Sequence, residues 1–341
     1  MIRMSKTFNV AVVGATGAVG EVMLSILAER KFPVGRIHAL ASARSAGGSV
    51  KFGDDDIMVG DLATFDPTGI DIALFSAGGS ISKEYGPKFA AAGAVVIDNS
   101  SAFRYDDDVP LVVSEVNPEA AKQRPRGIIA NPNCSTMQMM VALGPIHRKV
   151  GIVRINVATY QSVSGAGRSG PEELAKQTAA LLSFKDPDPK RFPVQIAFNL
   201  IPHIDDFQDN GYTKEEMKLV WETRKILGDD NIQVNPTAVR VPVFYGHSEA
   251  VNVETRDKIT AEEVRTLLST APGVEVVDER GPGGYPTPVT HASGRDAVYV
   301  GRIRDDISHP KAVNLWIVSD NIRKGAALNA VQIAELVAAE G

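Results

Sequence analysis

Residues 8–20 read FNVAVVGATGAVG, and the first half of the chain is organised around this segment. It begins with an apolar, β-branched run at residues 8–13, which predicts a buried parallel strand. Three glycines follow at intervals of three, and apolar residues then recur at helical spacing over residues 22–27. A strand, a glycine-rich turn and a helix in this order predict a site for the phosphates of a dinucleotide.

The three glycines have separate tasks in such a turn. Gly14 permits the tight turn, Gly17 lets the backbone approach a pyrophosphate, and Gly20 allows the helix to pack closely on the strand. The spacing is G-x-x-G-x-x-G, whereas the more familiar pattern is G-x-G-x-x-G. A tight strand–helix turn without a ligand is therefore the alternative interpretation.

The end of the second expected strand, residues 37–42, bears on which dinucleotide binds. An NAD enzyme usually has Asp or Glu there, which binds the ribose hydroxyls. This chain has Ser42, Arg44 and Ser45 instead. A cation with hydroxyl groups suits a 2′-phosphate, so the segment favours NADP. The alternative is that Arg44 is a solvated loop charge.

The remainder of the first half repeats the strand–helix order. Further strands are expected at residues 71–75, 94–98, 111–114 and 127–130, and a helix at 82–92. This order predicts a doubly wound α/β domain of the Rossmann type with a parallel sheet. Ligands of such sheets bind beyond the carboxyl ends of the strands. We therefore expect Gly17, Ser76, Arg104 and Cys134 to share one cleft.

The only cysteine, Cys134, lies in the segment NPNCST at residues 131–136, directly before an apolar run at helical spacing. A thiol at a helix N-terminus is stabilised as the reactive thiolate. The placement therefore predicts a catalytic nucleophile, and a small buried hydrophobe is the alternative. One thiol and scattered histidines give no metal-ligand pattern, so we expect no metal.

The second half has more strands and fewer helices. Strands are expected at residues 153–164, 238–245, 250–255, 274–277, 298–303 and 314–318, and helices at 172–184, 212–227, 260–269 and 326–338. This pattern predicts an α+β domain with a mixed sheet. A second subunit is a good cover for one face of that sheet, so we expect a homodimer. The 212–227 helix carries charges at spacings of three or four, namely Glu215, Lys218, Glu222 and Lys225, and most of them are expected on a solvated face with ion pairs.

The bulk properties limit the choice of function. A chain of 341 residues is expected to form two domains. We place the dinucleotide domain at residues 1–133 plus 322–341 and the catalytic and dimerisation domain at 134–321. The net charge of −5 and the lack of a basic block argue against nucleic acid. No apolar run could cross a membrane, residues 1–6 show no signal core, and a single cysteine suits a reducing cytoplasm.

Four motifs together resemble the aspartate-semialdehyde dehydrogenases of the bacterial type. They are the glycine turn, NPNCST, YQSVSGAG at residues 160–167 and GHSE at residues 246–249, and they cover the whole chain in order. The resemblance implies an NADPH-linked interconversion of L-aspartyl 4-phosphate and L-aspartate 4-semialdehyde. This reaction is an early step towards lysine, threonine and methionine.

The resemblance also assigns catalytic roles. It implies that Cys134 is the nucleophile that carries the acyl group and that His247 is its acid/base partner. A histidine with a pKa near 6.5 could move this proton at neutral pH. Gln161 would orient the substrate, and Arg240 would hold the substrate carboxylate at two points. Asn133, or backbone N–H groups at the helix start, could stabilise the oxyanion, which is a hypothesis.

Further matches concern phosphate and cofactor. The resemblance implies that Arg104 and Lys218 bind phosphate and that Glu215 lies near the substrate amine. The cofactor contacts that it implies, together with Gly14 and Ser76 from the turns above, are Thr16, Gly17, Ala18, Val19, Arg44, Ser45, Ser164, Gly165 and Asn321.

Three other interpretations compete. An N-acetyl-glutamyl-phosphate reductase would share the turn and the cysteine, but a Pro-Gly-Cys approach would favour it, and this chain has Pro132-Asn133-Cys134. A glyceraldehyde-type phosphorylating dehydrogenase is disfavoured because Arg44 argues against NAD. A non-catalytic nucleotide-binding relative is disfavoured because Cys134 and His247 are both present.

Overall fold

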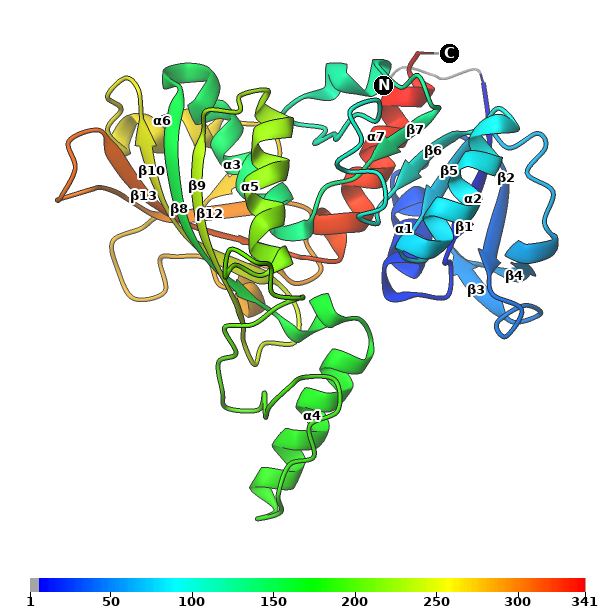
Figure 1. The fold of residues 1–341 in the computed structure, drawn as a ribbon, viewed down its shortest axis with the longest axis horizontal. Coiled ribbons are helices and arrows are strands. Elements are labelled where there is room, and N and C mark those ends of the chain that lie inside the picture. The colour runs from blue at the N-terminus through cyan, green and yellow to red at the C-terminus, as the bar shows by residue number, and fades with distance from the viewer. Residues whose placement is uncertain (1–5, 341) are drawn as a thin grey trace. The chain divides into compact units, whose positions relative to one another are not determined.

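The structure is a computed structural model that describes residues 6–340. Its internal contacts divide the chain into two compact units, each of which Figure 1 shows. Unit 1 comprises Met1–Asn133 and Ala326–Gly341, and unit 2 comprises Cys134–Gly325. The sequence shows no signal core in residues 1–6. Of these, residues 1–5 lie outside the described residues. Within residues 6–340, no helix combines the length and the apolar character needed to cross a bilayer.

Unit 1 is built on a sheet with the strand order β3-β4-β2-β1-β5-β6-β7. Its strands are β1 (Phe8–Val13), β2 (Val34–Ala41), β3 (Ser49–Phe52), β4 (Asp55–Asp61), β5 (Ile72–Phe75), β6 (Val95–Asp98) and β7 (Ile128–Ala130). Neighbours pair in parallel except β3 and β4, which form an antiparallel hairpin at the edge. The expected doubly wound α/β domain is confirmed, although the β3–β4 hairpin was not expected.

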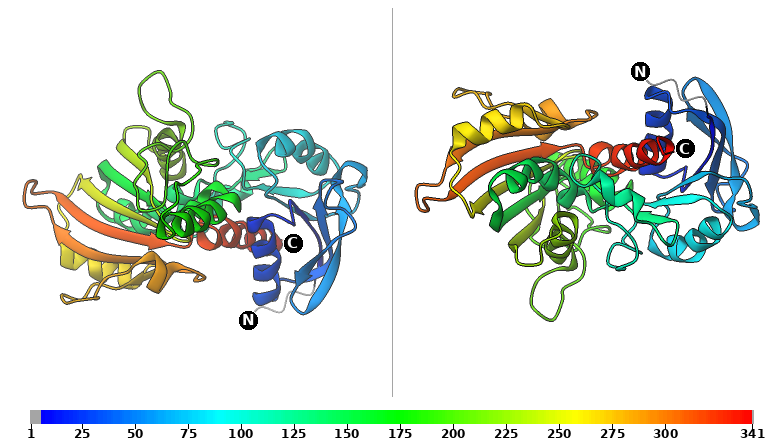
Figure 2. Two further views of the ribbon diagram at one scale, coloured as in Figure 1. Left: turned by 90° about the horizontal axis from the view of Figure 1, so that it is seen from below. Right: turned by 90° about the horizontal axis from the view of Figure 1, so that it is seen from above.

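Helices cover both faces of this sheet. Along β5, Ile72 and Leu74 face the core that α1 (Ala18–Glu29) and α7 (Asn329–Ala338) complete. Phe75 points the other way, where its ring meets Phe89 of α2 (Gly79–Ala91) edge-on. Figure 2 shows α1 and α7 side by side. The C-terminal helix thus returns to the first unit, as the sequence predicts.

The strand expected at residues 111–114 is wrong. Only Leu111 makes a bridge, to Ala130 of β7. Side-chain amides replace the ladder that a strand would need. The Asn117 side chain accepts from the N–H of Val113 and donates to the C=O of Leu111. The chain therefore turns at this point, since its backbone groups are satisfied locally.

Unit 2 contains a mixed sheet with the order β11-β12-β13-β10-β8-β9, as expected. Its strands are β8 (Ile152–Gln161), β9 (Gln233–Arg240), β10 (His247–Thr255), β11 (Val274–Val276), β12 (Val298–Asp305) and β13 (Ala312–Ser319). Helices α3 (Cys134–Val150), α5 (Lys214–Leu227) and α6 (Ala261–Ser269) pack on one face. Helix α4 (Ser169–Leu182) projects from the sheet, as Figure 1 shows.

The register of unit 2 aligns side chains in rows on the helix-covered face. His247 pairs with Ser319, Ser248 pairs with Tyr160, and Gln161 pairs with Arg240. We call the set Ser319, His247, Gln161 and Arg240 the terminal row. Two residues further along each strand lies the second row, which consists of Ile317, Glu249, Thr159 and Ala238. Four strands from distant parts of the chain thus bring one polar row together.

Two further expectations for unit 2 need correction. The strand expected at 238–245 is β9, which begins at Gln233 and ends at Arg240. β9 is an edge strand, so it tolerates Pro236 within it, and Pro242 follows soon after its end. On α5, Glu215 and Glu222 are buried, so these charges do not form a solvated face. The Glu215 carboxylate instead accepts hydrogen bonds from Gln161 and Lys218 in the site described below.

Candidate active site

The glycine turn of unit 1 has the geometry of an anion cradle. Gly14 has φ +86°, and a Cβ there would lie 2.9 Å from the backbone N of Ala77. Ser76 packs on the same turn, since its hydroxyl donates to the C=O of Val13 at 3.3 Å. Gly17 is the N-cap of α1 and offers no side-chain acceptor to the first N–H groups of the helix. These N–H groups suit a phosphate. The expected contact residues Thr16, Ala18 and Val19 are half-buried at this helix start.

Arg44 and Ser45 lie in the turn that follows β2. Because β1 and β2 pair in parallel, this turn and the glycine turn leave the sheet at the same edge. The N–H of Ser45 donates to the C=O of Ser42 at 2.8 Å and tightens the turn. Arg44 is exposed and Ser45 half-buried. A cation in this position can reach a phosphate that extends beyond the strand ends.

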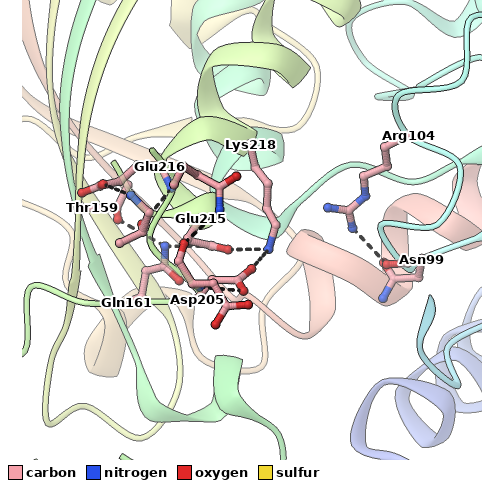
Figure 3. Close-up of polar contacts among 11 residues, drawn as sticks. Asn99, Arg104, Thr159, Gln161, Asp205, Glu215, Glu216 and Lys218 are labelled. Carbon is pink, nitrogen blue, oxygen red and sulfur yellow. Dashed lines mark hydrogen bonds and ion pairs between the residues drawn. The ribbon is translucent and has the colours of Figure 1, made fainter. Parts of the chain in front are cut away.

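Arg104 is only 6% exposed and is fixed by unit 1. Its Nε donates to the C=O of Asn131 at 2.9 Å. Its Nη2 donates to the C=O of Asn99 at 3.0 Å, as Figure 3 shows. The Asn131 amide in turn donates to the Asn99 side chain at 2.6 Å. Nearby, the buried Asp98 carboxylate accepts from the hydroxyl and N–H of Ser100. Burial raises the pKa of Asp98, and these hydrogen bonds oppose the rise.

His247 occupies the terminal row and is fully buried. The N–H of Ser162 donates to its Nδ1 at 3.1 Å, and the Ser162 hydroxyl lies 3.0 Å from the same atom. A backbone N–H can only donate, so Nδ1 is an acceptor and the neutral ring carries its proton on Nε2. Within residues 6–340, Nε2 has no hydrogen-bond partner. His247 is therefore a hydrogen-bond donor whose Nε2–H is available within the described residues.

The pKa of His247 differs from the ordinary value on which the sequence argument relied. Burial, followed by the charge of Arg240, lowers it from 6.5 to about 3, although Glu215 acts in the opposite direction. The imidazole is consequently neutral at physiological pH. This state fits a hydrogen-bond donor that offers its Nε2 proton to a developing negative charge.

Gln161, Glu215, Lys218 and Asp205 form a chain of polar contacts, which Figure 3 shows. Gln161 Nε2 donates to Glu215 Oε1 at 3.1 Å and to Thr159 Oγ1 at 3.2 Å. Lys218 Nζ donates to Glu215 Oε2 at 2.9 Å and to Asp205 Oδ2 at 2.8 Å. Glu215 thus links a neutral amide, which points from the sheet, to a cation on α5.

The charge state of this chain follows from its contacts. Burial lowers the pKa of Lys218, but Glu215 and Asp205 together outweigh it, so the net pKa is higher than usual. Lys218 therefore stays an ammonium. For Asp205, burial raises the pKa, but the hydrogen bond and charge of Lys218 bring it below its ordinary value. Two carboxylates and one ammonium leave this cluster acidic overall, which suits a substrate amine.

Arg240 ends β9 and is 6% exposed. Its Nη1 donates to the C=O of Ser162 at 2.8 Å. Burial lowers its pKa, whereas the charges of Glu215 and of the Cys134 thiolate raise it. Cys134 is the first residue of α3 and is half-buried. The charge of Cys134 thus acts on Arg240, so the predicted nucleophile and the predicted ligand of the substrate carboxylate influence each other.

Gly165 keeps the space beside this pair open. A Cβ at Gly165 would lie 2.8 Å from Arg240 Nη1 and 3.2 Å from His247 Nε2. Any side chain here would displace the two functional groups. The glycine therefore supports the expectation that a ligand approaches at this position.

Ser164 and Asn321 have a structural connection that the sequence did not suggest. Asn321 Oδ1 accepts from the hydroxyls of Ser162 and Ser164 and from the N–H of Gly246. These three bonds fasten the turn after β8 to the residue before His247. Asn321 thus holds the histidine in place, whatever else it contacts.

Sequence reasoning assembled most of these residues but missed several partners. Ser162 was visible within the YQSVSGAG motif, although its bond to His247 was not. Asp205 lies in a long loop without periodic signal, and Thr159 resembled an ordinary strand residue. Asn133 is buried and ends unit 1. Its proposed oxyanion role, and the sharing of one cleft by Cys134 with residues of unit 1, stay predictions.

Family models match both halves of the chain. The model described as “Semialdehyde dehydrogenase, NAD binding domain” matches residues 9–124, and “Semialdehyde dehydrogenase, dimerisation domain” matches residues 143–324. A protein of Legionella pneumophila named aspartate-semialdehyde dehydrogenase is 60% identical over 341 residues, which are 99% of this chain and 97% of that protein. One of Aquifex aeolicus with the same name is 56% identical over 98% of this chain and 99% of its own length.

Solved structures agree with these matches. Aspartate semialdehyde dehydrogenase II of Vibrio cholerae, described as complexed with ASA, is 58% identical with a TM-score of 0.96, and the match covers 98% of this chain and 99% of that one. An aspartate semialdehyde dehydrogenase with NADP from Candida albicans is 25% identical, with a TM-score of 0.75 over 97% of this chain and 98% of that one.

Proposed function

The chain belongs to the semialdehyde dehydrogenase family, and we propose on this basis that it is an NADP-dependent aspartate-semialdehyde dehydrogenase. The resemblance that the motifs suggested is thereby confirmed. The reaction is the reversible reductive dephosphorylation of L-aspartyl 4-phosphate to L-aspartate 4-semialdehyde, on the route to lysine, threonine and methionine. The terminal row carries this proposal, because it aligns His247, Gln161 and Arg240 on the face that α3, with Cys134 at its start, covers.

Unit 1 fits NADP as the dinucleotide. When bound, NADPH supplies the hydride that reduces the acyl group. The glycine turn with Gly14, Gly17 and Ser76 would hold the pyrophosphate, and the exposed Arg44 would meet the 2′-phosphate. The name of the Candida albicans structure, which includes NADP, supports the same choice.

Substrate recognition follows from the charges of unit 2. Arg240 offers a planar guanidinium to the α-carboxylate, and it is already oriented by its bond to Ser162. Glu215 suits the substrate amine. Its carboxylate accepts hydrogen bonds from Gln161 and Lys218, and because it is buried, its interactions with charged groups are strong. Arg104 and Lys218 are the cations proposed to bind phosphate. Fixing the substrate at both ends holds its reacting carbon in place.

The chemistry uses Cys134 as a covalent carrier. Its thiolate attacks the carbonyl carbon of the acyl phosphate, a carbon–sulfur bond forms, and the carbon–oxygen bond to phosphate breaks. After reduction of the thioester, the resulting oxyanion needs a donor, which His247 Nε2–H and the N–H groups at the start of α3 can provide. Asn133 is a further candidate donor. The carbon–sulfur bond then breaks to release the aldehyde and the thiolate.

The proposed function also gives each domain a role and implies a homodimer in the cytoplasm. Residues 1–133 with 322–341 form the NADP-binding domain, and residues 134–321 form the catalytic and dimerisation domain. The match to a dimerisation domain supports a homodimer, and the half-buried Asn156, Tyr160 and Asn252 on the sheet face opposite α3 suit a subunit interface. A nucleophilic thiol needs a reducing environment, which supports a cytoplasmic location.

The decisive measurement is phosphate-dependent reduction of NADP with aspartate semialdehyde, in the wild type and in Cys134→Ala. We expect turnover by the wild type only, with NADP binding retained by both proteins. Activity with N-acetyl-glutamate semialdehyde but none with aspartate semialdehyde would move the assignment to the related reductase. Absence of turnover with either aldehyde, despite NADP binding, would indicate a non-catalytic relative.

A further inference from the structure

Glu249 is a buried carboxyl group that the proposed mechanism does not use. It lies on β10 two residues after His247, so both side chains point to the helix-covered face of the sheet. Its exposed fraction is 0%. Within residues 6–340, neither of its carboxyl oxygens has a hydrogen-bond partner. A buried polar group without a partner destabilises a fold, so its presence calls for a functional reason.

The surroundings of Glu249 are uncharged. In the second row it pairs with Thr159 of β8 and Ile317 of β13. From α3, the Gln138 amide is the polar group that acts on it. Burial raises the pKa of Glu249 well above its ordinary value, and Gln138 opposes this rise only in part. Burial in these surroundings therefore favours the neutral carboxylic acid form of Glu249.

Gln138 has the complementary chemistry. It is 0% exposed, and within the described residues its amide N and O have no partner of normal hydrogen-bond geometry. A protonated carboxyl has one donor and a free acceptor, and a primary amide has both as well. The two groups can satisfy each other with two hydrogen bonds after a small side-chain rotation. A charged Glu249 could not donate its half of this pair.

The location of the pair links it to the reaction. Gln138 follows Cys134 by four residues, so both lie on the same face of α3. Glu249 follows His247 by two residues on the same face of β10. α3 packs directly on β10. Gln138 is thus one helical turn from Cys134, and Glu249 is one row from His247.

We propose that Glu249, paired with Gln138, is a positioning residue that sets the approach of α3, and therefore of the Cys134 thiol, to β10 and the His247 ring. The inference rests on the proposed function for the roles of Cys134 and His247. It explains why an acid persists in a sheet face whose next row is formed by Val157, Val251 and Leu315, all of them buried and apolar. Its action is on geometry, so it should alter turnover more than substrate binding.

The test compares two substitutions in the full chain. Glu249→Gln keeps a neutral group that can donate and accept, and Glu249→Met keeps the length but removes all hydrogen bonding. We expect Glu249→Met to lower kcat about 10- to 100-fold, as a misplaced reactive group does. Its KM for aspartate semialdehyde should stay within about twofold, and its Tm should fall by no more than a few degrees, because the buried Gln138 amide loses its partner. Glu249→Gln should keep kcat within about threefold.

Two controls separate positioning from stability. Thr223→Val removes another fully buried hydroxyl that lacks a partner in the described residues, on α5. It should leave kcat unchanged while Tm stays equal or rises. Gln138→Leu should reproduce the loss caused by Glu249→Met, and the double variant should lose no more than either single one, because the two residues act as a unit. If Glu249→Met does not fold, Gln138→Leu takes its place.

A readout that is independent of turnover is the rate at which iodoacetamide alkylates Cys134. We expect Glu249→Met to change this rate several-fold, while Glu249→Gln and Thr223→Val match the wild type. The proposal is overturned if Glu249→Met retains kcat and the alkylation rate within twofold. It is equally overturned if Glu249→Gln and Glu249→Met lose Tm and kcat in parallel. If the wild type itself does not act on aspartate semialdehyde, the proposed function fails, and the alkylation rates alone decide the role of Glu249.

Discussion

The glycine turn of unit 1 and the terminal row of unit 2 use different kinds of chemical group to meet a ligand. In the turn, the groups that would meet the ligand are mainly backbone N–H groups, held by a local conformation that Gly14 and its φ of +86° make possible. In the terminal row, the groups are side chains that arrive from β13, β10, β8 and β9. The residues of the turn are neighbours in the sequence, whereas Gln161 and Arg240 are 79 positions apart.

The difference shows how each kind of site responds to change. A backbone site depends on conformation, so a substitution damages it through strain and through the fold of unit 1. A side-chain site depends on individual functional groups, so a substitution removes chemistry while the sheet stays intact. The two sites should therefore separate cofactor binding from turnover.

The variant His247→Gln is expected to separate turnover from cofactor binding most strongly. Loss of the Nε2–H donor should lower kcat by about 10²–10³-fold, the range typical of a donor that stabilises an oxyanion. The substituted side chain is polar and of similar reach, and it leaves the glycine turn untouched. NADPH fluorescence titration should consequently give an unchanged Kd. A loss of NADPH binding that equals the loss of turnover would contradict the separation.

Arg240→Leu should act on the substrate instead of the chemistry. A buried guanidinium that grips a carboxylate contributes strongly to binding, so we expect the KM for aspartate semialdehyde to rise about 100-fold. Arg240→Lys should recover only part of this loss, because an ammonium cannot make two parallel contacts. Steady-state kinetics at saturating NADP and phosphate give the answer. Equal KM values for all three proteins would remove Arg240 from the substrate site.

The sequence predicted the turn better than the row for a physical reason. Residues 8–20 contain the whole turn, and their composition alone fixes a strand, a bend and a helix start. The terminal row depends on strand register, which long-range packing determines. The family resemblance, carried over residue by residue, identified His247, Gln161 and Arg240. The spacing of residues along the chain could not indicate the hydrogen bond from Ser162 to His247 Nδ1, or the one from Lys218 to Asp205.

The same limit explains the errors. The expected strand at 111–114 has an apolar pattern, yet its backbone groups bond to Asn329, which is distant in the sequence. The Asn329 side chain accepts from the N–H of Ser114 and donates to the C=O of Val112. The charges of α5 have helical ion-pair spacing, yet Glu215 faces Gln161 of the sheet. The pKa of His247 likewise depends on burial, which no local pattern encodes. Tertiary contacts decided each of these cases.

The buried histidine should also make stability depend on pH. Its pKa is about 3 in the folded protein and 6.5 in the unfolded chain. As pH falls below 6.5, the unfolded chain takes up a proton that the folded protein does not. Its contribution to stability is therefore present above pH 6.5 and is lost progressively towards pH 3. Between pH 7.5 and 5 the wild type should lose about 2 kcal/mol relative to His247→Gln.

Urea unfolding of both proteins at a series of pH values measures this effect. Above about pH 7.5 the difference in unfolding free energy between the two proteins should be constant, which provides the internal control. A difference that stays constant down to pH 5 would mean that the folded protein protonates His247 normally. In that case the terminal row would be more hydrated than its burial indicates.

In unit 1, Gly14→Ala tests the backbone site directly. A Cβ at φ +86° is strained, and here it would meet Ala77 N at 2.9 Å. We expect a loss of stability of about 1–2 kcal/mol and weaker NADP binding. At saturating NADP, kcat should stay near the wild-type value, since the terminal row is unchanged. Gly69→Ala is the matched control, because Gly69 also has positive φ but nothing lies within 4 Å of its Cβ position.

The smallest effect should come from Arg44→Ala, the one side chain on which the backbone site relies for selectivity. Arg44 is exposed, so solvent screens its attraction to a 2′-phosphate. We expect the ratio of kcat/KM for NADP to that for NAD to fall about tenfold, with kcat for either cofactor unchanged. The ratio should also fall in the wild type as salt rises, and this dependence should be weaker in the variant. If the variant keeps both the ratio and its dependence on salt, Arg44 is a loop charge, and the backbone turn alone must account for any preference between the two dinucleotides.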